Sequence, residues 1–147
     1  MFFYSVKSFI LKMRKKVGGE IMKQVEVLVE TSCNNAPKKA LLRDIMIAFI
    51  NDDISFLLEW LADDVSWKII GKRTYESKRI VEKALRELKI DSIQTMKIEN
   101  IITHGNVASL NGLLELKYET IHFCHVFRFN GFGKKAKINN ITSYIIK

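Results

Sequence analysis

The chain has 147 residues, of which 48% are hydrophobic and 27% charged, and its formal net charge is +8. This length and composition suit one soluble domain with a real core and exclude a disordered chain, and no apolar run reaches the roughly 20 residues that a membrane-spanning helix needs. A basic charge favours nucleic-acid binding, but the body carries no basic stripe, RNA-binding motif or zinc finger. We therefore expect no nucleic-acid partner and no membrane partner.

The first 21 residues differ from the rest, because they hold five basic residues against the single acid Glu20. The segment is compatible with a basic amphipathic helix at a membrane surface, or with a leader. Residues 18–22 can be encoded by GGAGGAGAAATAATG, which contains a bacterial ribosome-binding sequence just before the codon of Met22. We therefore predict that residues 1–21 are a leader or disordered extension, with Met22 as the native start, and that one domain spans residues 22–147.

The first half of this domain predicts one strand followed by helices. Valine at every second position from 25 to 29 indicates a short strand. Residues 34–37, Asn-Asn-Ala-Pro, form a helix start with an asparagine cap and a proline in the first turn. Residues 51–53 end this helix and cap a second one, which residues 63–64 end. The two helices have apolar residues at helical spacing, namely Leu41, Ile45, Ala48 and Phe49, then Ile54, Leu57, Leu58 and Leu61.

The second half predicts a third helix and then strands. Residues 65–70 alternate as a strand closed by Gly71, and Ser77 is placed to cap a helix that continues to Leu88. Four strands follow, near 92–104, 107–117, 119–129 and 137–146, and Gly112 within one of them indicates a bulge or bend. The order β-α-α-β-α-β-β-β-β predicts an α+β fold. In this fold a cone-shaped, curved antiparallel sheet packs on three N-terminal helices and leaves a cavity at its open end.

Several stretches resemble a known superfamily. Residues 61–71 combine a helix end, an acidic pair, a short strand with an aromatic residue and a glycine, and residues 75–78 then open a helix. Residues 121–129 and 138–144 resemble the last two strands of SnoaL-like bacterial proteins. Residues 25–147 are thus similar to the nuclear-transport-factor-2-like superfamily of cystatin-like rolls, which includes ketosteroid isomerases and SnoaL-like polyketide cyclases. The resemblance implies a homodimer through the outer sheet face, and late strands that are apolar on both faces agree with it.

His125 is the candidate catalytic residue. By strand alternation it shares a face with Phe123 and Phe127, so an inward face would place an imidazole in an apolar cavity. Burial lowers the pKa of a histidine, and a neutral histidine can act as a base. The alternative is a structural histidine bonded to a neighbouring group. Similar SnoaL-like sequences are expected to carry an acidic residue here, and ketosteroid isomerases use acidic groups, so this histidine departs from the pattern of the superfamily.

The expected ligand-binding residues are Trp67, Ile69, Phe123, Phe127 and Tyr144. Trp67 shares a face with Ile69, and the resemblance places it at the pocket wall or mouth, although core packing fits the pattern equally well. Tyr144 would donate a hydrogen bond into the cavity, unless it faces outward or lies in a dimer interface.

The predicted function is the binding of a small apolar or aromatic molecule, without a cofactor or metal ion. Cys33 and Cys124 form no CxxC pair and no Cys/His metal spacing, which is typical of a reduced cytoplasmic protein. Two alternatives stay open: an isomerase- or cyclase-type enzyme that moves a proton on an apolar ring substrate, and a dimeric interaction module. Binding is preferred because acid–base catalysis usually needs a second titratable partner, and only His125 is a credible pocket group.

Overall fold

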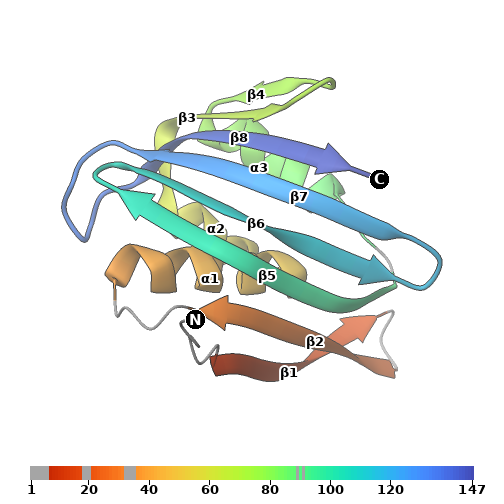
Figure 1. The fold of residues 1–147 in the computed structure, drawn as a ribbon. Coiled ribbons are helices and arrows are strands. Elements are labelled where there is room, and N and C mark those ends of the chain that lie inside the picture. The colour runs from red at the N-terminus through yellow and green to blue at the C-terminus, as the bar shows by residue number, and fades with distance from the viewer. Residues whose placement is uncertain (1–6, 18–20, 32–35, 89, 91) are drawn as a thin grey trace.

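The computed structural model describes residues 7–17, 21–31, 36–88, 90 and 92–147 (Figure 1). Asn34 and Asn35, which were expected to cap the first helix, and Cys33 lie outside these residues. The elements in chain order are β1 (Lys7–Val17), β2 (Ile21–Thr31), α1 (Pro37–Ile50), α2 (Ile54–Trp60), β3 (Leu61–Ile69), β4 (Thr74–Glu76), α3 (Lys78–Glu87), β5 (Ile93–His104), β6 (Val107–Leu116), β7 (Thr120–Phe129) and β8 (Ile138–Ile146).

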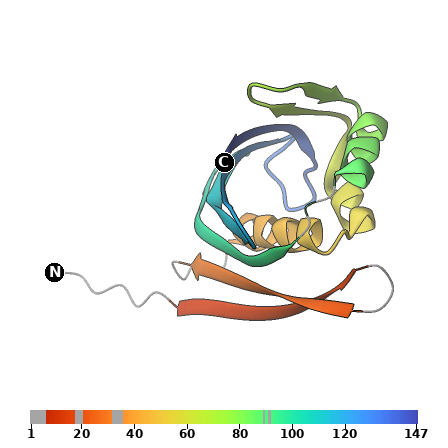
Figure 2. The same ribbon diagram turned by 90° about the vertical axis from the view of Figure 1, so that its right-hand side faces the viewer.

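The strands in the described ranges form one eight-stranded sheet in the order β1-β2-β5-β6-β7-β8-β3-β4. The sheet curls about α1, and α3 lies beside β3 (Figure 2), so the predicted α+β fold is confirmed. The sheet is not antiparallel throughout, however, because β2 pairs parallel with β5, and β3 pairs parallel with β8. Parallel neighbours need long crossover connections, and here helices lie between the paired strands in the sequence.

The helices begin where polar or proline residues favour a start. Pro37 stands in the first turn of α1 behind Ala36 as the cap, and the Asp53 carboxylate accepts from the Phe56 backbone N–H at the start of α2. The Ser77 hydroxyl caps α3 as predicted, and such caps satisfy N–H groups that a helix start leaves unpaired. Within the described ranges, no helix combines the length and apolarity that crossing a membrane requires.

The second helix is shorter than predicted. Leu61 begins β3 instead of continuing α2, and Asp63 and Asp64 lie exposed inside that strand instead of ending a helix. The pairing of β3 with β8 is irregular between Leu61 and Ser66, and such an irregularity allows two consecutive side chains to face solvent. The edge strand β4 was also missed, because its three residues are too few to show a period.

Residues 7–17 form β1, which pairs antiparallel with β2 from Lys7 opposite Thr31 to Val17 opposite Ile21. These residues therefore form a strand and not an amphipathic helix. Ile21, the last residue of the predicted leader, begins β2, and residues 1–6 and 18–20 lie outside the described part of the chain. Strand pairing carries no information on where translation begins, so a native start at Met22 stays a prediction.

A bulge interrupts the pairing of β5 with β6 opposite Gly112. Ile98 pairs with Gly112, but the next pair is Asn100 with Asn111, which leaves Glu99 as an extra residue in β5. A Cβ atom on Gly112 would overlap the backbone of β5. The predicted irregularity is therefore confirmed, and the extra residue stands in the strand opposite the glycine. Bulges of this kind increase the local bend of a sheet and help it to curl.

Candidate functional site

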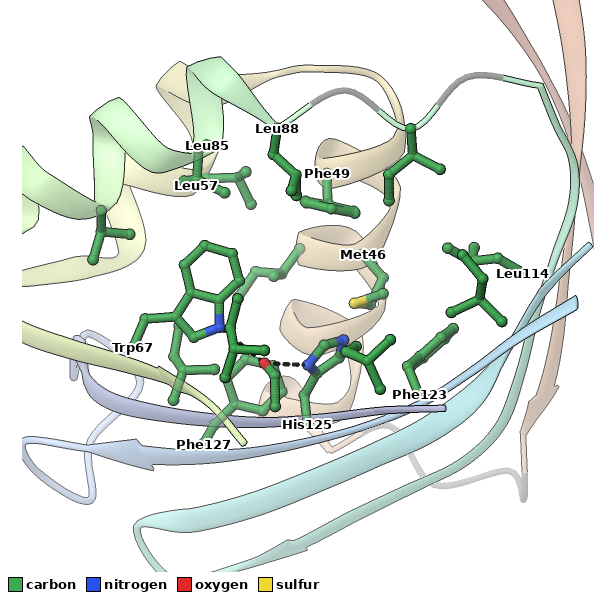
Figure 3. A pocket seen from close by; sticks show the side chains of 18 of the residues that line it. Met46, Phe49, Leu57, Trp67, Leu85, Leu88, Leu114, Phe123, His125 and Phe127 are labelled. Carbon is green, nitrogen blue, oxygen red and sulfur yellow. Dashed lines mark hydrogen bonds between the residues drawn. The ribbon is translucent and has the colours of Figure 1, made fainter. Parts of the chain in front are cut away.

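The curled sheet and the helices surround a cavity of about 300 Å³ (Figure 3). Its wall is mainly apolar. Met46 and Phe49 reach it from α1, Leu85 from α3, and Phe123 and Phe127 from β7. Small-molecule pockets begin at roughly this size and are walled mainly by apolar and aromatic groups.

The alternation of β7 decides which of its side chains face the cavity. Phe123, His125 and Phe127 line it, whereas His122 and Arg128 are exposed on the other face. The assignment of faces made from the sequence is therefore confirmed for this strand. His122 and His125 point in opposite directions and cannot hold one ligand together.

One polar cluster interrupts the apolar wall, and it consists of Trp67, His125 and Ser143. The indole Nε1–H of Trp67 donates to Ser143 Oγ over 2.9 Å, and the same oxygen lies 2.7 Å from Nδ1 of His125 (Figure 3). Ser143 is only 1% exposed. The Trp67 N–H, the Ser143 hydroxyl and Nδ1 of His125 therefore find their partners inside the cluster, as buried polar groups require.

His125 is held among aromatic rings. Its ring centroid lies 5.2 Å from that of Phe123, nearly stacked, and 6.1 Å from that of Phe127. Burial lowers the pKa of His125 from 6.5 to about 4, because apolar surroundings disfavour the charged imidazolium. The imidazole is therefore neutral at physiological pH.

The charged groups of the cavity wall are lysines. Lys72 and Lys147 line it, and no Asp or Glu side chain does so among the described residues. Lys72 follows β3 and Lys147 follows β8, and because these two neighbouring strands run parallel, both lysines lie at the same end of the cavity. In the same part of the chain, no three His, Cys, Asp or Glu side chains gather in an arrangement suited to a metal ion.

Most of the residues expected at the site line the cavity. This set comprises Trp67, Ile69, Phe123, His125 and Phe127.

Tyr144 does not line the cavity. It is 45% exposed, and its neighbours Ser143 and Ile145 face inward, so alternation turns the tyrosine to the outer face. The prediction that Tyr144 donates a hydrogen bond into the cavity is wrong, and Ser143 supplies the hydroxyl of β8 instead. The signal for Ser143 was its spacing of two from Ile141 and Ile145, which both line the cavity.

No family model and no curated protein matches the chain, but solved structures do. An NTF2-like protein of unknown function from Cytophaga hutchinsonii is 22% identical with a TM-score of 0.60, over 74% of this chain and 98% of that one. A candidate ketosteroid isomerase from Kribbella flavida is 14% identical with a TM-score of 0.64, over 76% and 78%. A candidate SnoaL-like polyketide cyclase from Shewanella denitrificans is 12% identical with a TM-score of 0.62, over 77% and 92%. The curled sheet, the helices that pack on it and these matches show that the chain has the nuclear-transport-factor-2-like fold.

Proposed function

We propose that the protein binds a small, largely apolar molecule in the cavity at the centre of the cone. The observation that supports this proposal is an apolar space of about 300 Å³ with a buried polar cluster in the part of its wall that the structure describes. Side chains around an empty space lack dispersion partners, which an apolar ligand would supply. The transfer of the ligand out of water would add a favourable free energy of about 25 cal/mol per Å² of its buried apolar surface. The polar cluster would orient that ligand.

The charges of the wall favour a neutral or anionic ligand over a cationic one. The Lys72 and Lys147 side chains provide two positive groups at one end of the cavity, and no Asp or Glu side chain in the described wall balances them. A cationic ligand would therefore meet repulsion on entry and have no buried partner.

A blocking substitution tests this role. Leu57→Trp places a bulky ring in the wall, and Ile102→Trp adds the same ring at a position that is 61% exposed on β5. We expect saturable binding of the neutral probe 2-acetylnaphthalene, followed by calorimetry, to be lost in Leu57→Trp and kept in Ile102→Trp. Cooperative urea unfolding of both variants would show that the fold is intact. Equal binding by the two folded variants would contradict a binding site in the cavity.

A second candidate function is proton transfer on an apolar ring substrate. The names of the Kribbella and Shewanella neighbours favour it, as does a neutral imidazole inside the cavity. A base with a pKa of about 4 is weak at neutral pH, however, and the described wall holds no carboxylate as a second acid–base group. Hydrogen–deuterium exchange at the α-carbon of 2-tetralone, slowed at least tenfold in His125→Ala, would favour the enzyme.

We also propose that the outer sheet face forms a homodimer. On this face Cys124 of β7 pairs with Tyr144 of β8, and Val126 and the 68% exposed Ile146 flank them. An exposed apolar face of this kind is typical of an interaction surface. A cytoplasmic location is part of the same proposal, since Cys124 is a free thiol.

A further inference from the structure

The direction of the hydrogen bonds in the polar cluster follows from what each group can donate. An indole N–H only donates, so Ser143 Oγ accepts the bond from Trp67. The hydroxyl proton of Ser143 then needs an acceptor of its own. Because Ser143 is only 1% exposed, bulk solvent does not provide that acceptor.

The acceptor is Nδ1 of His125, 2.7 Å from the hydroxyl oxygen. Among the described residues, the Ser143 hydroxyl has two hydrogen-bond partners, Nε1 of Trp67 and Nδ1 of His125. A ring nitrogen that accepts a hydrogen bond carries no proton, and a neutral imidazole carries only one proton. The proton of His125 must therefore be on Nε2. The lowered pKa of His125, which results from burial, keeps this neutral form dominant at pH 7.

Nε2 of His125 is left as a donor without a partner among the described residues. Figure 3 shows this nitrogen on the side of the ring away from Ser143 and toward Met46, which is also a residue of the cavity wall. A ligand that buries this N–H without accepting from it would lose a hydrogen bond to water and gain none.

We propose that Ser143, oriented by Trp67, holds His125 in the Nε2–H tautomer, so that the cavity selects apolar ligands that carry a hydrogen-bond acceptor such as a ketone or ester carbonyl. This inference rests on the proposed binding function and specifies its ligand class. It also gives His125 the role of a donor that polarises a carbonyl, because the nitrogen facing the cavity has no free lone pair to remove a proton. Ser143 and Trp67 are positioning residues in this arrangement.

The tautomer can be measured without any ligand. Long-range ¹H–¹⁵N correlation spectra at pH 7 distinguish a protonated ring nitrogen from one with a lone pair, and His125→Gln identifies the signals. We expect Nε2–H in the wild type and in Ser143→Thr, which keeps the hydroxyl, and a mixture of both tautomers in Ser143→Ala. Nδ1–H in the wild type would overturn the inference and needs no folded variant to be seen. An unchanged tautomer in Ser143→Ala would overturn the role of Ser143.

The ligand class is tested with two probes of matched shape. 2-Acetylnaphthalene carries a carbonyl where 2-isopropenylnaphthalene carries a CH₂ group. We expect the ketone to bind the wild type roughly three- to tenfold more tightly, as one neutral hydrogen bond allows, and this preference to vanish in His125→Leu. Equal affinities in the wild type would overturn the ligand class and leave the binding function standing. Binding of neither probe would overturn the proposed function, and the tautomer measurement would then decide the inference separately.

Discussion

Ser143 of β8 and His125 of β7 are directly paired residues, and their side chains meet at 2.7 Å on the inner face of the sheet. On its other side Ser143 pairs with Ile69 of β3, the strand that also carries Trp67. Trp67 and Ser143 are 76 residues apart in the chain. The polar cluster therefore forms only when the parallel pairing of β3 with β8 is made, and the integrity of the site depends on that long-range contact.

Removing the hydroxyl of Ser143 is expected to destabilise the fold. Ser143→Ala leaves both the Trp67 N–H and Nδ1 of His125 without their partner, and each unsatisfied buried polar group costs about 1–3 kcal/mol. We expect the free energy of unfolding in urea to fall by about 2 kcal/mol or more. Thr142→Ala, one residue earlier and on the opposite face of β8, is the control. Losses of equal size in the two variants would contradict the account of the cluster.

The stability of the protein should depend on pH through His125. Burial holds the pKa of His125 at about 4 in the folded protein, against an ordinary value of 6.5 that applies to the unfolded chain. At a pH between 4 and 6.5, His125 therefore binds a proton in the unfolded chain but not in the folded protein. The free energy of unfolding is therefore highest above pH 6.5 and falls as the pH drops toward 4, by at most about 3 kcal/mol from this group.

His125→Gln isolates this contribution, since the carboxylates that titrate in the same range are common to both proteins. The charged groups of the wall nearest to His125, Lys72 and Lys147, are likewise present in both proteins. Urea unfolding curves at pH 7.5 and 4.5 should show a larger loss in the wild type than in the variant. Parallel pH profiles would show that His125 titrates normally.

Gly112 should tolerate no side chain. A Cβ atom there would overlap the carbonyl oxygen of Lys97 and approach Cα of Ile98 to 3.0 Å, and backbone atoms cannot move aside cheaply. We expect Gly112→Ala to lower the free energy of unfolding by about 2–4 kcal/mol, the range for overpacked or strained sites. Gly133→Ala has nothing within 4 Å of its new methyl group and should be nearly neutral. Similar urea midpoints for the two variants would contradict this close approach of strands.

The sequence predicted the inner face of β7 but not that of β8, and the reason is physical. In β7 one face carries Phe123 and Phe127 and the other carries exposed His122 and Arg128, so polarity marks the inside. In β8 both faces of the strand carry apolar residues, because Ile141 and Ile145 line the cavity while Ile146 is exposed on the outer face. A period of two then fixes which residues share a face but not which face is buried.

The pairing of strands that lie far apart in the chain could not be predicted from the sequence, for a different reason. Local patterns predicted the caps of α2 and α3 and the irregularity at Gly112, since each depends on a few neighbouring residues, whereas the N-cap of α1 is Ala36 and not an asparagine. The parallel contacts of β2 with β5 and of β3 with β8 depend on the path of the whole chain around α1. The partner of Nδ1 of His125 could therefore not be named in advance, and with it the tautomer stayed undetermined.

The outer face of the sheet gives the last prediction. Val126 lies on it between Ser109 of β6 and Thr142 of β8, and a carboxylate placed there would be buried without a partner if two copies pack through this face. We expect sedimentation velocity to show a dimer for the wild type and a monomer for Val126→Asp. Tyr118→Asp, at a residue that is 88% exposed in the turn between β6 and β7, should remain a dimer. A wild type that sediments as a monomer at every concentration would refute the dimer, and dissociation by both variants would place the interface elsewhere.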